Sequence, residues 1–184
     1  MKRLLLALCL LAACKEEAAV PDPVSLDAEA IGYFCQMNIL DHGGPKAQVH
    51  LDAFPGKPLF FSQVRDAVAY LRMQEKDGQV QASYVTDMGS SPDWEAPALA
   101  GWIAAEKAVY VVGSDRLGGM DQPEFIPFAD PAAAQAFAAE HGGSVMPLAD
   151  IPDTALSNPE AAAAPGDAAD FTTRLKSLSQ PEGN

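Results

Sequence analysis

LFFSQVRDAVAYLRMQEKDG, residues 59–78, combines the start, the apolar face and the stop of a helix. Ser62 is a suitable N-cap, and Gly78 follows the last residue of the pattern. Between them the apolar residues recur three and four positions apart, at Val64, Ala67, Val68 and Leu71. This spacing predicts an amphipathic helix whose Val68 and Leu71 face a core.

Strands are predicted on both sides of this helix. AQVHLDAF, residues 47–54, places apolar residues at alternate positions, and QVQASYVTD, residues 79–87, does the same. GYFCQM, residues 32–37, reads as an earlier apolar strand, followed by a turn at Gly43-Gly44-Pro45. Residues 31–92 are therefore predicted to form a β-β-α-β unit.

The same order recurs in residues 93–152, after a linker that we expect to form a covering loop with a helical turn. KAVYVVGSD (107–115) and PEFIPFA (123–129) read as strands joined by the glycine-rich turn RLGGM (116–120), and SVMPLAD (144–150) reads as a closing strand. DPAAAQAFAAEHGG (130–143) is a well-marked helix, with Asp130 as N-cap, Pro131 at its first position and Phe137 facing the core. We predict an α+β fold of two pseudo-repeated β-β-α-β units.

The two ends of the chain read as segments outside this fold. MKRLLLALCLLAAC, residues 1–14, has a basic start and an apolar run, which predicts a secretory signal peptide at 1–13. Its LAAC ending resembles a bacterial lipobox, so we expect lipidation of Cys14; the alternative is an ordinary signal peptide with Cys14 as a free thiol. Residues 14–30 are then a disordered, lipid-anchored tether, and residues 153–184 a low-complexity, disordered tail.

The charge balance excludes some partners. The formal net charge is −13, and removal of Lys2 and Arg3 with the signal takes it to about −15 (−13 − 2). So acidic a chain will not bind nucleic acid through the phosphates, and attraction to anionic lipid is opposed. We therefore expect the lipid anchor, rather than electrostatic attraction, to hold it to the membrane.

A lone thiol near a thioether is the main chemical signal. The chain has three cysteines, and loss of Cys9 and lipidation of Cys14 leave Cys35 as the thiol of the mature protein. Cys35 and Met37 form a Cys-x-Met pair of soft donors, which favour Cu(I) over hard cations. The chain lacks the Cys and His ligands of a zinc site, and it has neither the C-x-x-C-H of a c-type haem nor a redox C-x-x-C.

Plainer readings of the same residues remain open at this point. Met37 and Met120 could fill the core, as methionines usually do, and Cys35 could be buried and inert. His42 is within reach of Cys35 in a hairpin and is a further candidate ligand, although a loop histidine is often only solvated. His50 is expected on the polar face of its strand. We find no combination of nucleophile, base and oxyanion hole, and therefore predict that the protein is not an enzyme.

The order of motifs resembles a known family. A signal with a lipobox, FCQM soon after it, VYVVGSDRLGGM, a Pro-Phe strand and an Ala-rich helix resemble the NosL family over residues 1–151. These are copper-binding periplasmic lipoproteins of nitrous oxide reductase maturation. The resemblance implies a Cu(I) site at Cys35, Met37 and Met120. It also agrees with the β-β-α-β repeat, since the family is similar in this to organomercurial lyase, but lyase chemistry would need a second thiol.

Two functions follow from these expectations. The first is a Cu(I) metallochaperone that, as the resemblance implies, supplies apo nitrous oxide reductase with the help of an ABC-type membrane complex. The alternative is a scaffold lipoprotein without metal that recruits partners in the same maturation complex. Thiol titration with and without Cu(I) separates the two, because only the chaperone should show copper-dependent protection of Cys35.

Overall fold

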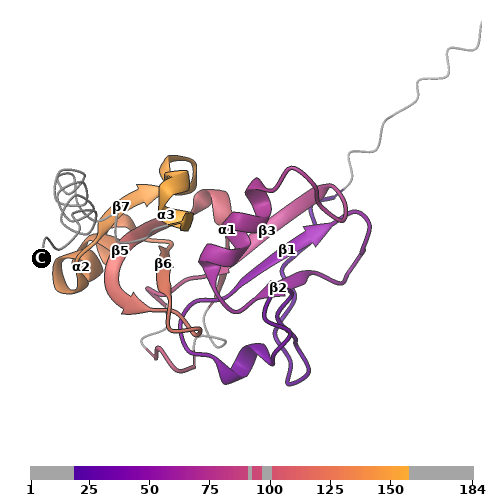
Figure 1. Cartoon of the computed structure of the whole chain (residues 1–184), viewed down its shortest axis with the longest axis horizontal. Coiled ribbons are helices and arrows are strands. Elements are labelled where there is room, and N and C mark those ends of the chain that lie inside the picture. The colour runs from indigo at the N-terminus through magenta and orange to yellow at the C-terminus, as the bar shows by residue number, and fades with distance from the viewer. Residues whose placement is uncertain (1–18, 91–92, 97–100, 158–184) are drawn as a thin grey trace, which may run out of the picture.

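The computed structural model describes residues 19–90, 93–96 and 101–157, and it contains two β-β-α-β units. The first consists of β1 (Ala47–Leu51), β2 (Leu59–Phe61), α1 (Val64–Arg72) and β3 (Val80–Thr86). The second consists of β5 (Val109–Leu117), β6 (Pro123–Phe128), α2 (Pro131–His141) and β7 (Ser144–Pro147). The two units lie side by side, with α1 and β6 near their boundary (Figure 1).

Each unit carries its own antiparallel sheet, and the two sheets share one topology. The strand orders are β2-β1-β3-β4 and β6-β5-β7, so the first strand of each unit is central and is flanked by the second and third. This confirms the α+β prediction of two repeated units. The additional strand β4 (Trp102–Ala104) lies in the linker, where we expected a loop with a helical turn. Three residues are too few to show an alternating pattern.

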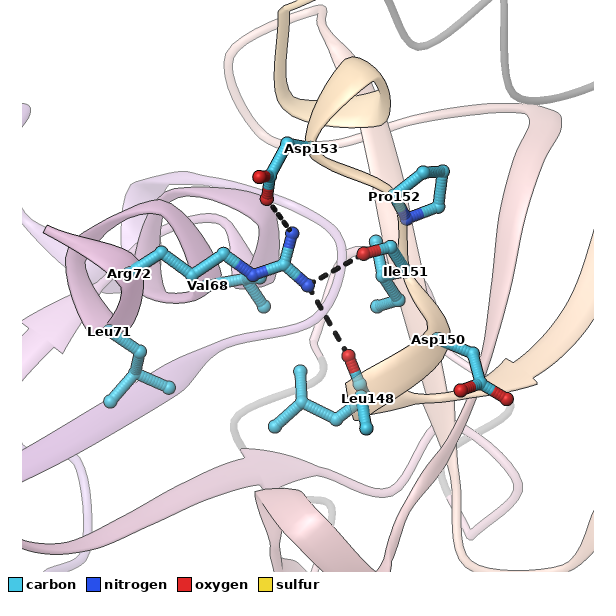
Figure 2. A pocket seen from close by; sticks show the side chains of 9 residues that line it. Val68, Leu71, Arg72, Leu148, Asp150, Ile151, Pro152 and Asp153 are labelled. Carbon is cyan, nitrogen blue, oxygen red and sulfur yellow. Dashed lines mark hydrogen bonds and ion pairs between the residues drawn. The ribbon is translucent and has the colours of Figure 1, made fainter.

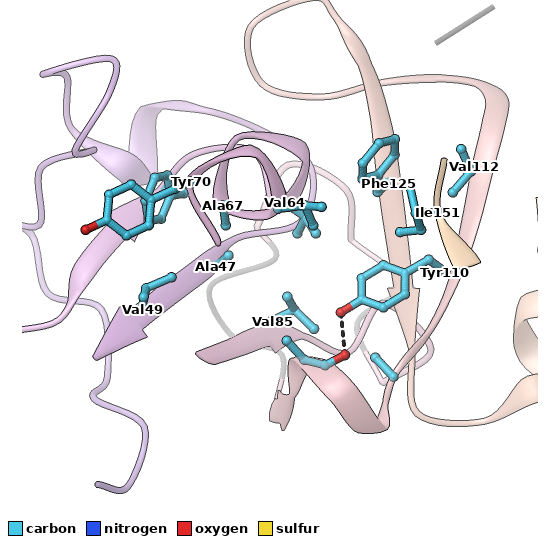
Figure 3. Close-up of a cluster of buried hydrophobic side chains, with 14 of the residues drawn as sticks. Ala47, Val49, Val64, Ala67, Tyr70, Val85, Tyr110, Val112, Phe125 and Ile151 are labelled. Atoms are coloured by element: carbon cyan, nitrogen blue, oxygen red, sulfur yellow. Dashed lines mark hydrogen bonds between the residues drawn. The ribbon is translucent and has the colours of Figure 1, made fainter. Parts of the chain in front are cut away.

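One hydrophobic core joins the two units. Figure 3 shows Val64 and Val85 of the first unit packed near Tyr110 and Phe125 of the second, all of them buried. The Tyr110 hydroxyl donates a hydrogen bond of 2.7 Å to the carbonyl of Ala105. Because apolar surface of each unit is buried against the other, the hydrophobic effect stabilises the pair rather than each unit alone.

The predicted helices differ in how far they are buried. Val68 is buried in the core, and Leu71 and Phe137 are half-buried but pack against the core clusters, as predicted. In α2 the predicted cap is confirmed, since the Asp130 carboxylate accepts a hydrogen bond of 2.9 Å from the amide of Ala132. The helix ends at Gly142, whose φ of 73° suits glycine.

Ser62 is not the N-cap of α1, contrary to the sequence prediction. The N-cap position is Gln63, whose side chain makes no capping hydrogen bond. Instead Glu124 of β6 accepts hydrogen bonds from the amides of Val64 (3.0 Å) and Arg65 (2.8 Å). The first helix is therefore capped by a carboxyl group from the other unit, which satisfies two of the free amides at its N-terminus.

The GYFCQM segment is a closed loop rather than a strand. An isolated antiparallel bridge joins Ile31 to Asn38, and the amide of Gly32 donates to the carbonyl of Met37 at 2.9 Å. The second strand of the first unit is instead β2, just before the predicted helix, where no strand was predicted. The repeat order is preserved because Leu59–Phe61 pairs with Ala47–Val49.

Part of the predicted N-terminal tether is fixed to the first sheet. The side-chain amide of Gln48 accepts from the amide of Val24 (2.8 Å) and donates to its carbonyl (2.9 Å). The Tyr84 hydroxyl donates to the carbonyl of Pro21 at 2.7 Å. His50, expected on a polar face, is 3% exposed and bonded to Gln48, and this burial lowers the pKa of its imidazole. Cys14 lies outside the described residues.

The beginning of the predicted tail is also structured. A helix, α3 (Asp153–Ser157), occupies its first five residues, and Ala155 is buried. Arg72 of α1 donates to the carbonyls of Leu148 (3.4 Å) and Ile151 (2.7 Å) and pairs with Asp153 at 2.7 Å (Figure 2). These bonds cross a pocket of about 560 Å³ between α1 and the C-terminal segment. None of the helices described here is long and apolar enough to cross a membrane.

Candidate metal centre

Cys35 lies within the 31–38 loop, which is held against the first unit by aromatic contacts. The ring of Phe34 packs edge-on against Phe61 at 5.3 Å, and the Tyr33 hydroxyl donates to Asp77 at 2.6 Å. The Asp77 carboxylate and burial raise the pKa of Tyr33 to about 12, so this hydroxyl remains a donor at neutral pH. The backbone next to Cys35 is therefore fixed by one residue that precedes α1 in the sequence and one that follows it.

The Cys35 sulfur is half-buried and closely surrounded. Its Sγ accepts a hydrogen bond of 3.5 Å from the hydroxyl of Ser62. On the other side it lies against Gly32, where an added Cβ would come within 2.3 Å of Sγ. Glycine is thus required at position 32 for the thiol to occupy this place.

The rim around Cys35 is apolar and open to solvent. Four large apolar residues of this segment are exposed by 39–48%: Ile31, Phe34, Met37 and Leu40. Met37 is therefore not a core filler, because 40% of its surface is accessible. Its thioether is free to meet a metal ion or an incoming protein.

His42 connects this segment to the second unit. Its Nδ1 lies 2.9 Å from the carbonyl oxygen of Gly119, and since a carbonyl can only accept, Nδ1 must carry the proton. The Nε2 atom of the neutral ring therefore has a free lone pair. That atom is buried from solvent and has no hydrogen-bond partner within the described part of the chain. A histidine whose other nitrogen is fixed by a carbonyl is the usual arrangement of a metal ligand.

The turn that carries Met120 approaches His42 very closely. A Cβ at Gly119 would lie 2.5 Å from the Cβ of His42 and 2.8 Å from the carbonyl oxygen of Gly43. Gly118 is similarly confined by Glu124, which would lie 2.8 Å from a Cβ there. The two glycines thus allow the half-buried Met120 to sit beside the His42 segment.

Comparisons with known proteins identify the family of this chain. A family model described as NosL matches residues 23–156. This chain belongs to the NosL family. It is 48% identical over 181 residues to a copper-binding lipoprotein NosL of Achromobacter cycloclastes, covering 96% of this chain and 93% of that protein. It is 32% identical over 149 residues to a copper-binding lipoprotein NosL of Stutzerimonas stutzeri, covering 79% and 75%.

A solved structure supports the fold of this NosL-family chain. The crystal structure of the copper chaperone NosL from Shewanella denitrificans is similar, with a TM-score of 0.66 and 28% sequence identity. The likeness covers 72% of this chain and 97% of that one. The resemblance inferred from the motifs is therefore confirmed, and the matched range includes Cys35, Met37, His42 and Met120.

The candidate residues Cys35 and Met120 do not occupy equivalent places in the two units. Met120 does lie in the β5–β6 turn, but the equivalent β1–β2 turn spans residues 52–58, and Cys35 precedes β1. The pseudo-symmetry therefore does not relate the two candidate ligands. The His42–Gly119 contact brings their segments together instead.

The donor set suits a soft ion. Within the ranges described, no three His, Cys, Asp or Glu side chains gather as a metal site. Cys35, Met37, Met120 and His42 supply thiolate, thioether and imidazole, which are donors that Cu(I) prefers. The remaining described methionines lie in packing or surface positions, with Met73 exposed, Met88 buried and Met146 half-buried.

Proposed function

We propose that this NosL-family protein binds one Cu(I) ion through Cys35, Met37 and Met120, with His42 as a nitrogen ligand, and passes it to an acceptor. The single observation that carries this proposal is the Nε2 of His42, which is buried next to the Met120 turn and has no hydrogen-bond partner among the residues that the structure describes. A buried polar atom without a partner costs free energy, and a metal ion would remove that cost. The copper in the names of the relatives supports the identity of the metal.

The exposure of the ligands suits transfer rather than storage. Met37 is accessible, Cys35 and Met120 are half-buried, and the apolar rim around them can be covered by a partner. Ligands at a surface can be replaced one at a time by those of an acceptor, whereas a closed cage would hold the ion. Binding and delivery, rather than catalysis, are the functions that this arrangement favours.

The acceptor and the location extend the proposal. We take the acceptor to be apo nitrous oxide reductase, assisted by an ABC-type membrane complex of the same maturation system. We further place the protein on the periplasmic side of a bacterial membrane, the outer membrane in our proposal, through a lipid on Cys14. The word lipoprotein in the names of two relatives supports the anchor.

Anaerobic Cu(I) titration with X-ray absorption tests the site. We expect one tightly bound Cu(I), sulfur neighbours from Cys35 and the methionines, and a nitrogen neighbour that disappears in His42→Phe. A matched His141→Phe variant, whose ring bonds Asp115 at the end of α2, should keep the nitrogen signal. A protein that binds no Cu(I), with Cys35 equally reactive in the presence and absence of copper, would instead favour the scaffold function.

Gly119→Ala is expected to weaken Cu(I) binding without unfolding the chain. The new methyl group would overlap the Cβ of His42 and the carbonyl of Gly43, so the Met120 turn must move outward. We expect a loss of about tenfold or more in Cu(I) affinity, comparable to the removal of an outer-shell partner of a metal ligand. A competition titration measures this, with Gly101→Ala as the control because, its chain neighbours aside, no atom of the described residues lies within 4 Å of its added Cβ. Equal affinities in the two variants would contradict a role for the turn.

A further inference from the structure

Lys46 places a buried positive charge beside the glycines that follow His42 and the serine that contacts Cys35. Only 1% of the residue is exposed. Its Nζ donates to the carbonyls of Gly43 (2.8 Å) and Gly44 (2.6 Å), directly after His42. It also donates to the carbonyl of Ser62 at 3.4 Å, and the hydroxyl of the same serine contacts the sulfur of Cys35.

The ammonium is held in place by the fold. The φ of 75° at Gly44 is a left-handed conformation that glycine adopts without strain, and here two successive carbonyls converge on Nζ. The Lys46 backbone is fixed to Thr86 of β3 by hydrogen bonds in both directions. With three acceptors around Nζ, the side chain cannot swing away to let the charge reach water.

Burial of a lysine is costly, and its surroundings offset only part of that cost. Burial lowers the pKa of Lys46 to about 8, while Glu124, Glu95 and Cys35 act in the opposite direction. The ammonium therefore stays mostly protonated at neutral pH. A neutral side chain of similar length would fill the same volume without this cost, so the charge itself calls for an explanation.

We propose that Lys46 is a specificity-determining residue whose fixed positive charge makes the site prefer monovalent Cu(I) to divalent cations. The inference rests on the proposed copper site at Cys35 and His42. The repulsion between a fixed charge and a bound ion is proportional to the charge of that ion, so a divalent ion is penalised twice as strongly as Cu(I). The thiolate and one monovalent ion already neutralise each other, whereas a divalent ion leaves a net positive charge beside the ammonium.

The test is the ratio of two affinities, measured in the full chain. Cu(I) affinity is measured anaerobically against a chromophoric chelator, and Zn(II) affinity against a second chelator, in wild type and in Lys46→Met. We expect the preference for Cu(I) over Zn(II) to shrink by about tenfold in Lys46→Met, the size of a modest charge–charge interaction. Damage to the fold would weaken the binding of both metals and leave the ratio of their affinities unchanged. The exposed Lys57→Met makes the same chemical change and should keep the wild-type ratio.

Two further variants make the outcome decisive. Lys46→Arg keeps the charge and should keep the ratio. Should Lys46→Met not fold, Lys46→Gln retains a donor for the glycine carbonyls but not the charge, and the same shift is expected. A folded neutral variant with the wild-type ratio overturns the inference while leaving the copper site intact. A wild-type protein that binds no Cu(I) overturns the proposed function itself.

Discussion

Cys35→Ser is expected to abolish Cu(I) binding at any useful affinity while leaving the fold intact. Cys35 is the one free cysteine in the part of the chain that the structure describes, and the thiolate is the strongest donor of the proposed set. A serine hydroxyl is of similar size, so it can still accept from Ser62, but it is a hard and protonated donor. Loss of an outer-shell partner costs 10- to 100-fold in metal affinity, and loss of this ligand should exceed ~100-fold.

A series of methionine variants provides the matched comparison for this result. Met120→Ile should weaken Cu(I) binding less than Cys35→Ser, because a neutral thioether contributes less than a thiolate. Met37→Ile should have the smaller effect of the two if Met37 acts during transfer, and an equal effect if it binds in the resting state. Met73→Ile, on an exposed residue at the end of α1, should change nothing. Retention of tightly bound Cu(I) by Cys35→Ser, in competition with a chelator, would place the site elsewhere.

The repeat could be predicted because its signals are local. The cap at Asp130, the glycines after α2 and the helical spacing around Val68 depend only on neighbouring residues, and the structure confirms them. The errors occur where tertiary contacts replace a local signal. Ser62 has the right chemistry for an N-cap, but Glu124, 60 residues away in sequence from Val64, provides the cap. A distant carboxylate leaves no trace in the sequence around the helix.

The site was only partly predictable for the same reason. Cys35 and Met37 form a short motif, and Met120 was identified by its resemblance to a family. The sequence does not reveal that Gly119 accepts from His42, because these residues are 77 positions apart. Lys46 was missed altogether, since a lysine before a strand is usually solvated and nothing local shows that it is buried. An unusual buried charge can be found only once the fold is known.

Glu124→Ala is expected to destabilise the fold more than any surface substitution, by about 3–5 kcal/mol. Glu124 is 1% exposed, and its oxygens accept from the amides of Val64 and Arg65 and from its own neighbour Phe125 (2.8 Å). Alanine would leave these buried donors without a partner and create a cavity where the two units meet. Chemical denaturation measures the loss, with Glu106→Ala as an exposed control. A loss below about 1 kcal/mol would mean that water replaces the carboxylate as the cap.

Glu124→Gln should separate the charge of this residue from its role as an acceptor, through the pH dependence of unfolding. Burial raises the pKa of Glu124 from 4.5 to about 8, so between these values the folded chain holds a proton that the unfolded chain releases. The stability contributed by Glu124 is therefore complete below pH 4.5 and is lost as the pH rises to about 8, a change of the order of 4 kcal/mol. Lys46, whose pKa is lowered to about 8, makes the stability rise above that pH, since its burial costs less once it is deprotonated.

We expect the free energy of unfolding of the wild type, relative to Glu124→Gln, to fall between pH 5 and 8, as measured by denaturation of the copper-free protein. Parallel curves for the two proteins would show instead that the three amide donors keep Glu124 ionised throughout this range, and that the cap of α1 is a permanent carboxylate.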